Sequence, residues 1–257
     1  MENAQRSARR PIALLVSMLA AVIAATGLAA CAVSVGALEH RTTTYSVPEP
    51  VRTLVVAAQV GNVQVTGGPK ATVSVTERST FHATAPTTTH RARDGTLTLT
   101  NKCPVAETCK VDYTINVPRA TTVRISDGAG AVRIGSITSS VSVKVNAGNI
   151  VLDSLAGPVD ATDHAGSITG NRLSSGKETL RVSAGRVDAT FAAPPAAINA
   201  TTDVGAITIR VPKSVPYDVK ASATVGKVTV AVPRSIASTH TIKVSTKTGA
   251  ITISPAP

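Results

Sequence analysis

Residues 141–152 read VSVKVNAGNIVL, and this stretch carries the pattern that decides the fold. Its first half alternates valine with polar residues, a period of two that predicts a β-strand with one buried face. Asn146 and Gly148 then predict a turn, because both residue types tolerate left-handed backbone angles. Ile150 and Leu152 resume the alternation, so the stretch predicts a strand, a turn and a second strand.

The same Gly-x-[Val/Ile] pattern recurs along the chain. Equivalent glycines occupy positions 61, 130, 148, 166, 185, 205, 226 and 249. From Gly130 onward the separations are 18, 18, 19, 20, 21 and 23 residues, and Val-Pro-basic turns at 211–213 and 232–234 interrupt the longer intervals. A period near twenty residues is typical of a solenoid, in which each repeat buries its apolar face against neighbouring repeats.

We therefore expect one all-β domain over residues 51–257, built as a β-solenoid or β-roll of roughly 18–20-residue coils. Residues 51–117 look more hairpin-like, with Asp94 and Gly95 between two alternating runs, so the N-terminal part should be hairpin-rich. The alternative is an antiparallel sandwich with the glycines at hairpin tips, which the near-constant spacing disfavours.

Composition supports an all-β chain and excludes several classes of protein. The 257 residues are 43% hydrophobic but only 2% aromatic and 16% charged. Plentiful β-branched residues and low charge argue against disorder, while scarce Leu, Met, Glu and Lys argue against a helical bundle. The shortage of aromatic side chains disfavours a lectin or a single-strand nucleic-acid binder that works by stacking, and we expect no specific nucleic-acid partner.

The N-terminus predicts export. Residues 1–30 combine three arginines with an apolar stretch, as in a signal peptide. Leu28-Ala29-Ala30-Cys31 resembles the bacterial lipobox, which implies a lipid on Cys31. The alternative is an uncleaved, single-span signal anchor reaching about residue 38, because no charge occurs between Pro11 and Leu38. Both place the domain outside the cytoplasm and attached to the cell membrane. Residues 31–50 are expected to form a tether.

The two remaining cysteines, Cys103 and Cys109, flank a short loop with a proline between two strand-like runs. In an exported protein such a pair predicts a disulfide.

The chain resembles an exported bacterial β-strand-repeat family of unknown function, described as "putative adhesin". The resemblance rests on the opening at Val51–Val56 with Gly61–Val65, on the cysteine hairpin leading into Val111–Pro118, and on the recurring Gly-x-[Val/Ile]-x-[Val/Ile] pattern. It covers about residues 50–255 and implies a solenoid-like fold at the cell envelope. The family has no agreed catalytic residues, so the resemblance implies none here.

Acidic residues before the repeat glycines are the main candidates for chemistry. Asp160, Asp163 and His164 form the densest polar cluster and are weak candidates for a cation site. Asp160, Asp163 and Asp203 are the residues that a glycan-active β-helix enzyme would use. The simpler interpretation is a ladder of turn-capping side chains, made of Asp127, Asn146, Asp163, Ser183 and Asp203. Zinc, phosphate-loop and serine-hydrolase motifs are missing, so we expect neither a cofactor nor catalysis.

Charge is the remaining indication of function. The formal net charge is +11, and removing three Arg and one Glu with residues 1–30 leaves +9. Several basic residues alternate with apolar ones and should form a basic face, the candidates being Arg133, Lys144, Arg186, Arg210 and Lys227. We expect a non-enzymatic, envelope-anchored binding or adhesion module, with anionic wall polymer, lipid head groups or an envelope protein as partner. A structural accessory lipoprotein without a ligand is the alternative.

Overall fold

The computed structural model describes residues 37–104 and 108–257. The signal segment and Cys31 lie outside the described residues, so their predicted roles stay predictions. Every regular element in the described ranges is a strand, and the 17 strands belong to one mixed sheet. Nowhere in the described ranges is there a helix with the length and apolar character needed to span a membrane.

The first eight strands are β1 (Glu39–Val47), β2 (Thr53–Val60), β3 (Val63–Gly68), β4 (Val73–Phe81), β5 (Thr87–Arg93), β6 (Thr96–Lys102), β7 (Cys109–Pro118) and β8 (Thr122–Gly135). The remainder are β9 (Val141–Asp153), β10 (Val159–Leu173), β11 (Lys177–Phe191), β12 (Ala197–Val204), β13 (Ile207–Val211), β14 (Asp218–Val225), β15 (Val228–Val230), β16 (Thr241–Thr248) and β17 (Ile251–Pro255).

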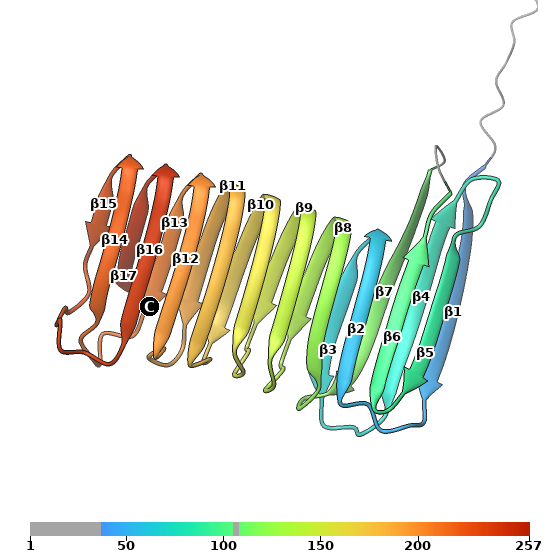
Figure 1. The fold of residues 1–257 in the computed structure, drawn as a ribbon. Coiled ribbons are helices and arrows are strands. Elements are labelled where there is room, and N and C mark those ends of the chain that lie inside the picture. The colour runs from blue at the N-terminus through green and yellow to red at the C-terminus, as the bar shows by residue number, and fades with distance from the viewer. Residues whose placement is uncertain (1–36, 105–107) are drawn as a thin grey trace, which may run out of the picture. The chain divides into compact units, whose positions relative to one another are not determined.

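The strands form two layers that face each other across the core (Figure 1). The first layer runs in the order β5, β6, β2, β8, β9, β10, β11, β12, β16, β14. The second runs in the order β1, β4, β7, β3, β8, β9, β10, β11, β13, β17, β15. The long strands β8–β11 contribute their first halves to one layer and their second halves to the other.

Pairing is parallel through the glycine repeats and antiparallel near the N-terminus. From β8 to β11, each strand pairs in parallel with the strand of the next repeat. This finding excludes the antiparallel sandwich for these repeats. The expected hairpin at Asp94-Gly95 is β5–β6, and β4 pairs antiparallel with both β1 and β7.

The predicted tether is wrong over residues 39–47. These residues form β1, which pairs with β4 along its whole length, from Glu39 opposite Phe81 to Val47 opposite Val73. Only Val47 of this strand is buried, so β1 lacks the apolar alternation that would reveal a strand. Its position is fixed instead by the backbone ladder and by side chains such as Tyr45, whose hydroxyl donates to Glu77 Oε1 at 2.6 Å.

The last three repeats do not stack in chain order. β16 pairs with β12 on one side and with β14 on the other, and β17 lies in the same way between β13 and β15. The C-terminal repeat is therefore inserted between the two that precede it. This order explains why more residues separate Gly226 and Gly249 from the preceding repeat glycines. After β12 and β13 the chain passes over one place in the stack to form β14 and β15, and it then returns to fill that place with β16 and β17.

The repeat glycines meet in one column where the first layer turns into the second. Gly166 has φ of 153°, and a β-carbon there would overlap the carbonyl oxygen of Gly148 in the neighbouring repeat. The column continues through Gly185, Gly205, Gly249 and Gly226 in the same spatial order as the strands. Glycine is required at this corner because neighbouring backbones approach too closely for any side chain.

Inward positions of successive repeats stack into apolar columns. Val143, Ala161, Leu180 and Ala200 are direct neighbours in the parallel ladders, and each is completely buried. Burial of such aliphatic side chains contributes about 25 cal/mol per Å² of apolar area removed from water. The outward positions are left as two polar faces.

Candidate functional site

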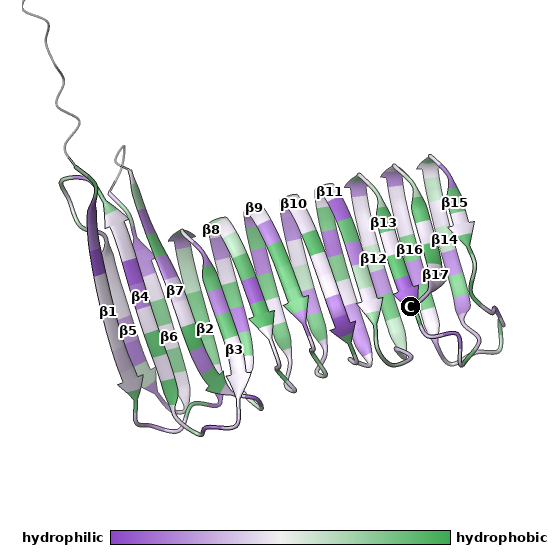
Figure 2. Cartoon of the chain, turned by 180° about the vertical axis from the view of Figure 1, so that it is seen from behind, coloured by the Kyte–Doolittle hydropathy of each residue, from purple (hydrophilic) through white to green (hydrophobic). Residues whose placement is uncertain are grey.

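The outward side of the first layer is the candidate site, and we call it the first-layer face. Two neighbouring rows of side chains cross it from β8 to β14, with a spacing of about 4.8 Å between adjacent strands. One row is Arg124, Ser142, Asp160, Thr179, Asn199, Lys243 and Lys220. The other row is Ser126, Lys144, Thr162, Arg181, Thr201, Ser245 and Ser222. Figure 2, which views the opposite side, shows the same alternation of hydrophilic and hydrophobic bands along β8–β11.

These two rows hold five cations and one carboxylate, and all five cations are exposed. The single acid, Asp160, forms an ion pair with Arg181 at 3.0 Å. Arg124, Lys144 and Lys243 form no ion pair with any residue in the described ranges. The rest of the two rows is mostly Ser, Thr and Asn, so the face combines positive charge with hydroxyl and amide groups that donate and accept hydrogen bonds.

The outward side of the second layer, the second-layer face, also carries cations, of which Arg133, Arg186 and Lys227 form no ion pair within the described residues. One of its rows is Arg133, Val151, Thr169, Asp188, Thr208, Thr252 and Thr229. Arg210 pairs with Asp188 at 2.5 Å, and Arg172 pairs with Asp153 at 2.8 Å. Part of the positive charge on this face is therefore already satisfied within the chain.

The five basic candidates from the sequence do not lie on one face. Lys144 lies on the first-layer face, whereas Arg133, Arg186, Arg210 and Lys227 lie on the second-layer face. The alternation of apolar and basic residues correctly indicates that these side chains point outward. It carries no information on which half of a repeat belongs to which layer, so the sequence did not show that Arg124 and Lys243 share a face with Lys144.

Two shallow hollows lie on the first-layer face. One, of about 350 Å³, crosses the beginnings of β8–β11 and is lined by Arg124, Lys177, Ser142, Asp160 and Thr179 among others. The other, of about 300 Å³, crosses β12, β16 and β14 and is lined by Asn199, Lys220, Lys243 and nearby serines. Each hollow therefore contains two basic side chains beside hydroxyl or amide groups.

The cation candidates Asp160, Asp163 and His164 do not converge. Asp163 is completely buried in the core, while Asp160 and His164 are exposed and Asp160 is paired with Arg181. Asp203 lies apart from them and pairs with Lys247 at 2.8 Å. Within residues 37–104 and 108–257, no three His, Cys, Asp or Glu side chains are arranged to hold a metal ion.

The proposed ladder of turn caps divides into two groups. Asp127 and Asp163, three residues before their glycines, point into the core, and Asp163 Oδ1 accepts a hydrogen bond from the Ala165 N–H at 3.2 Å. Asn146 and Asp203, two residues before their glycines, lie exposed at the corner. Burial raises the pKa of Asp127 to about 6, although backbone N–H groups of Ala129 and Gly128 lower it, and burial also raises the pKa of Asp163.

A third buried acid, Glu178, was missed. Its side chain occupies an apolar column between Val159 and Ile198, and only 1% of the residue is exposed. Neither carboxylate oxygen has a hydrogen-bond partner among the described residues. Burial raises the pKa of Glu178 to about 8. The alternation of residues 177–182 places position 178 inward and could have revealed this burial.

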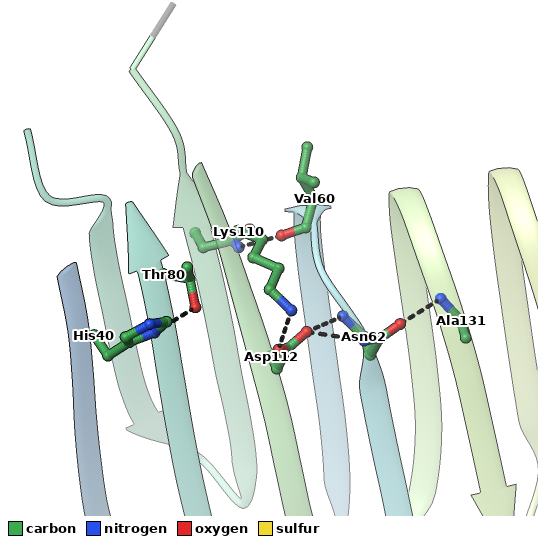
Figure 3. Close-up of polar contacts among 8 residues, drawn as sticks. His40, Val60, Asn62, Thr80, Lys110, Asp112 and Ala131 are labelled. Carbon is green, nitrogen blue, oxygen red and sulfur yellow. Dashed lines mark hydrogen bonds and ion pairs between the residues drawn. The ribbon is translucent and has the colours of Figure 1, made fainter. Parts of the chain in front are cut away.

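A polar network near the N-terminus joins β7 and β8 through Asn62, the residue just before β3 (Figure 3). Asp112 Oδ1 accepts from the Asn62 backbone N–H at 2.8 Å and from its side-chain amide at 3.0 Å. Asn62 Oδ1 accepts from the Ala131 N–H at 3.0 Å, while Lys110 Nζ contacts Asp112 Oδ2 at 3.0 Å. Each polar group in this network is satisfied by a neighbour, which indicates a structural role in attaching the hairpins to the first repeats.

The predicted disulfide between Cys103 and Cys109 is confirmed. Both cysteines are buried with Phe81 in a small apolar cluster, and Cys109 begins β7. The bridge therefore joins the region after β6 to the start of β7, at the end of the molecule that carries the hairpins.

No protein-family model matches the sequence, and no curated protein matches it either. Several solved structures align with the chain, and one of the following three aligns with a TM-score above 0.5. A "putative adhesin" from Bacteroides fragilis matches with a TM-score of 0.53 at 17% identity, over 84% of this chain and 97% of that one. A "putative adhesin" from Parabacteroides distasonis has a TM-score of 0.40 at 14% identity, over 83% of this chain and 96% of its own. A "putative cell adhesion protein" from Clostridium sporogenes has a TM-score of 0.36 at 13% identity, over 84% of this chain and 100% of its own.

Proposed function

We propose that this chain is a non-enzymatic binding protein of the bacterial cell envelope, of the adhesin type, and that its first-layer face binds anionic polymers rich in hydroxyl groups. The observation that carries the proposal is the composition of that face: five exposed cations and one already paired carboxylate, set among Ser, Thr and Asn side chains. The Bacteroides fragilis "putative adhesin" shares the fold, which is compatible with such a role.

The chemistry of the face selects the class of ligand. Phosphate or carboxylate groups of a wall polymer or acidic glycan would pair with Arg124, Lys144 and Lys243, which have no acidic partner in the described part of the chain. Sugar hydroxyls would exchange hydrogen bonds with the serines and threonines between these cations. The regular spacing of the rows suits an extended polymer better than a compact small molecule.

In this proposal the stacked repeats form a β-solenoid that acts as a rigid support for the face. The lipid on Cys31, or a signal anchor in its place, would hold the domain outside the cytoplasm at the membrane. The dispersed positions of Asp160, Asp163 and Asp203 disfavour the glycan-active enzyme, because paired carboxylates must flank the same glycosidic bond. An accessory lipoprotein without a ligand remains the alternative, and binding measurements separate the two.

The test is binding of the full chain, in detergent, to poly(glycerol phosphate), to polygalacturonate and to vesicles containing phosphatidylglycerol, at low and high salt. We expect saturable binding to at least one polymer that persists in part at high salt, because hydrogen bonds to the hydroxyl-rich face are screened less than charge pairs. Binding that disappears completely at high salt would show that only the net positive charge of the chain attracts the polymer, and would contradict a specific role of the first-layer face. A lack of binding at low salt would support the accessory lipoprotein.

A further inference from the structure

The strands at the two ends of the stack of repeats differ in how well their unpaired edges are protected from pairing with other chains. At the N-terminal end the outermost strands are β1 and β5, and both carry charged or polar side chains along their edges. At the other end the outermost strands are β14 and β15, which pair only with β16 and β17 in the described structure. Proteins commonly protect exposed strand edges with charged residues, because bare edges pair with other chains.

The inward side chains of this last repeat are incompletely covered. Val228 is 38% exposed, whereas Ile251, its neighbour in β17, is completely buried. Val219 is half-buried, although Ile242, its neighbour in β16, is completely buried. The core of the stack is therefore open to solvent on the outer side of β14 and β15.

A short segment covers only the beginning of this end. Tyr217 N–H donates to the Pro233 carbonyl at 2.9 Å, and Ser235 N–H donates to the Tyr217 carbonyl at 3.0 Å. Beyond this contact the edge of β14 is unpaired in the described structure. A hollow of about 270 Å³ lies here between Tyr217, Val219 and Ile236, and Ile236 itself is 96% exposed.

We propose that two copies of this chain pair through this end, with β14 lying antiparallel to β14 of the partner around a two-fold axis. In such a pair the unpaired backbone groups of β14 in each copy would hydrogen-bond to β14 of the other copy. The partner would also cover Val219 and Val228 and bury Ile236. The interface is isologous, so it closes after two copies and does not build a filament.

The charges of β14 fit an antiparallel pair of identical strands. Its two charged residues, Asp218 and Lys220, lie in the first half of the strand, and residues 222–225 carry no charge. In an antiparallel pair the first half of one strand lies beside the second half of the other. Lys220 then faces a neutral stretch of the partner rather than another lysine. Stacking β14 against β5, the opposite edge of the first layer, would instead place Lys220 near His90, Arg91 or Arg93, which disfavours a head-to-tail filament.

The test is the sedimentation velocity of the full chain in detergent, across a dilution series, with substitutions at the exposed residue Ser222. We expect a monomer–dimer equilibrium in the unchanged chain. Ser222→Lys places a second lysine beside Lys220 of the partner subunit and should weaken the dimer by about tenfold. Ser222→Glu changes the same side chain but adds the opposite charge, so it should leave the dimer intact or strengthen it. Thr42→Lys, at the edge of β1, is the control and should have no effect.

A chain that is monomeric at every concentration would overturn the proposal. Equal weakening by Ser222→Lys and Ser222→Glu would also overturn it, as would a dimer that responds to Thr42→Lys alone. In the register that places Ser222 beside Lys220 of the partner subunit, Ala221 lies opposite its own copy, so Ala221→Cys should yield a cross-linked dimer under mild oxidation. Failure of that variant to cross-link would contradict the pairing of β14 with itself. Polymer binding at the larger hollow of the first-layer face depends on Arg124 and Lys177 of β8 and β11 rather than on β14, so the two proposals can fail separately.

Discussion

A β-carbon added at Gly226 would overlap the carbonyl oxygen of Gly249, although Gly249 belongs to the following repeat along the chain and Gly226 to the outermost repeat in space. Gly249 in turn packs against Gly205. These contacts and the strand register give the same order of repeats. The C-terminal repeat therefore supports the one before it, and the end of the stack is made by residues 218–230 rather than by the chain terminus.

The glycine column predicts which glycine substitutions the fold tolerates. Gly166→Ala should destabilise the protein by about 3 kcal/mol or more, because the new methyl group would overlap the Gly148 carbonyl at a positive φ. Gly176→Ala is the matched control, since no heavy atom lies within 4 Å of its added β-carbon. Thermal unfolding of the two variants checks the prediction, and equal melting temperatures would contradict the close approach at the corner.

The inserted repeat predicts a specific set of cross-links. Cysteines at Thr201 and Ser245 should form a disulfide under mild oxidation, because these residues face each other on adjacent strands β12 and β16. Cysteines at Ser245 and Ser222 should do the same across β16 and β14. Cysteines at Thr201 and Ser222 should remain free, because β16 separates them. Stacking in chain order would reverse the first and third results, and non-reducing gel mobility with peptide mapping distinguishes the two orders.

Buried carboxyl groups predict that stability falls as pH rises. Glu178 has its pKa raised from 4.5 to about 8, so between these values the folded chain holds a proton that the unfolded chain has lost. The free energy of unfolding must therefore decrease across this pH window. Asp127, with its pKa raised from 3.8 to about 6, acts in the same direction at lower pH.

The matched variant for this effect is Glu178→Gln. It should stabilise the chain at pH 8 by about 1–3 kcal/mol, because an amide is neutral at every pH and does not place a charge in the apolar column. Denaturant unfolding at pH 5 and pH 8 measures the change. A Glu178→Gln variant whose stability falls with pH as steeply as that of the unchanged chain would show that the buried carboxyl is not the cause.

The disulfide predicts a moderate and local contribution to stability. Replacing Cys103 and Cys109 together by serine should cost about 2 kcal/mol, the chain-entropy value for so short a loop. Hydrogen exchange should increase most at the start of β7 and at its partners in β4. Reduction of the unchanged chain should give the same pattern, and an even increase along all repeats would contradict a local role.

Much of the all-β fold could be predicted from sequence because its signals are local. Alternation in residues such as 141–152 indicates the inward face, and the repeated glycines indicate the corners. The order of the last repeats could not be predicted, because their inward residues are nearly interchangeable. Ile198, Val219 and Ile242 occupy one column, so the pattern fits equally well in either order.

Other features were missed because their evidence is not local. β1 reads EHRTTTYSV and has almost no apolar side chain, so only its pairing with β4 identifies it as a strand. The division of Lys144 and Arg133 between two faces depends on where each repeat turns into the second layer. Consequently, a basic face could be predicted, but its members could not.

The central claim is that the first-layer face, rather than net charge, binds anionic polymer. The most direct measurement compares the affinity for poly(glycerol phosphate) of two variants of the full chain that lose the same charge. Arg124→Gln with Lys177→Gln removes both cations of the larger hollow on the first-layer face, while Arg133→Gln with Arg186→Gln removes two from the second-layer face. We predict at least a tenfold loss for the first pair and less than a threefold loss for the second, about 1.4 kcal/mol against less than about 0.7 kcal/mol. Equal losses in the two variants would contradict the claim.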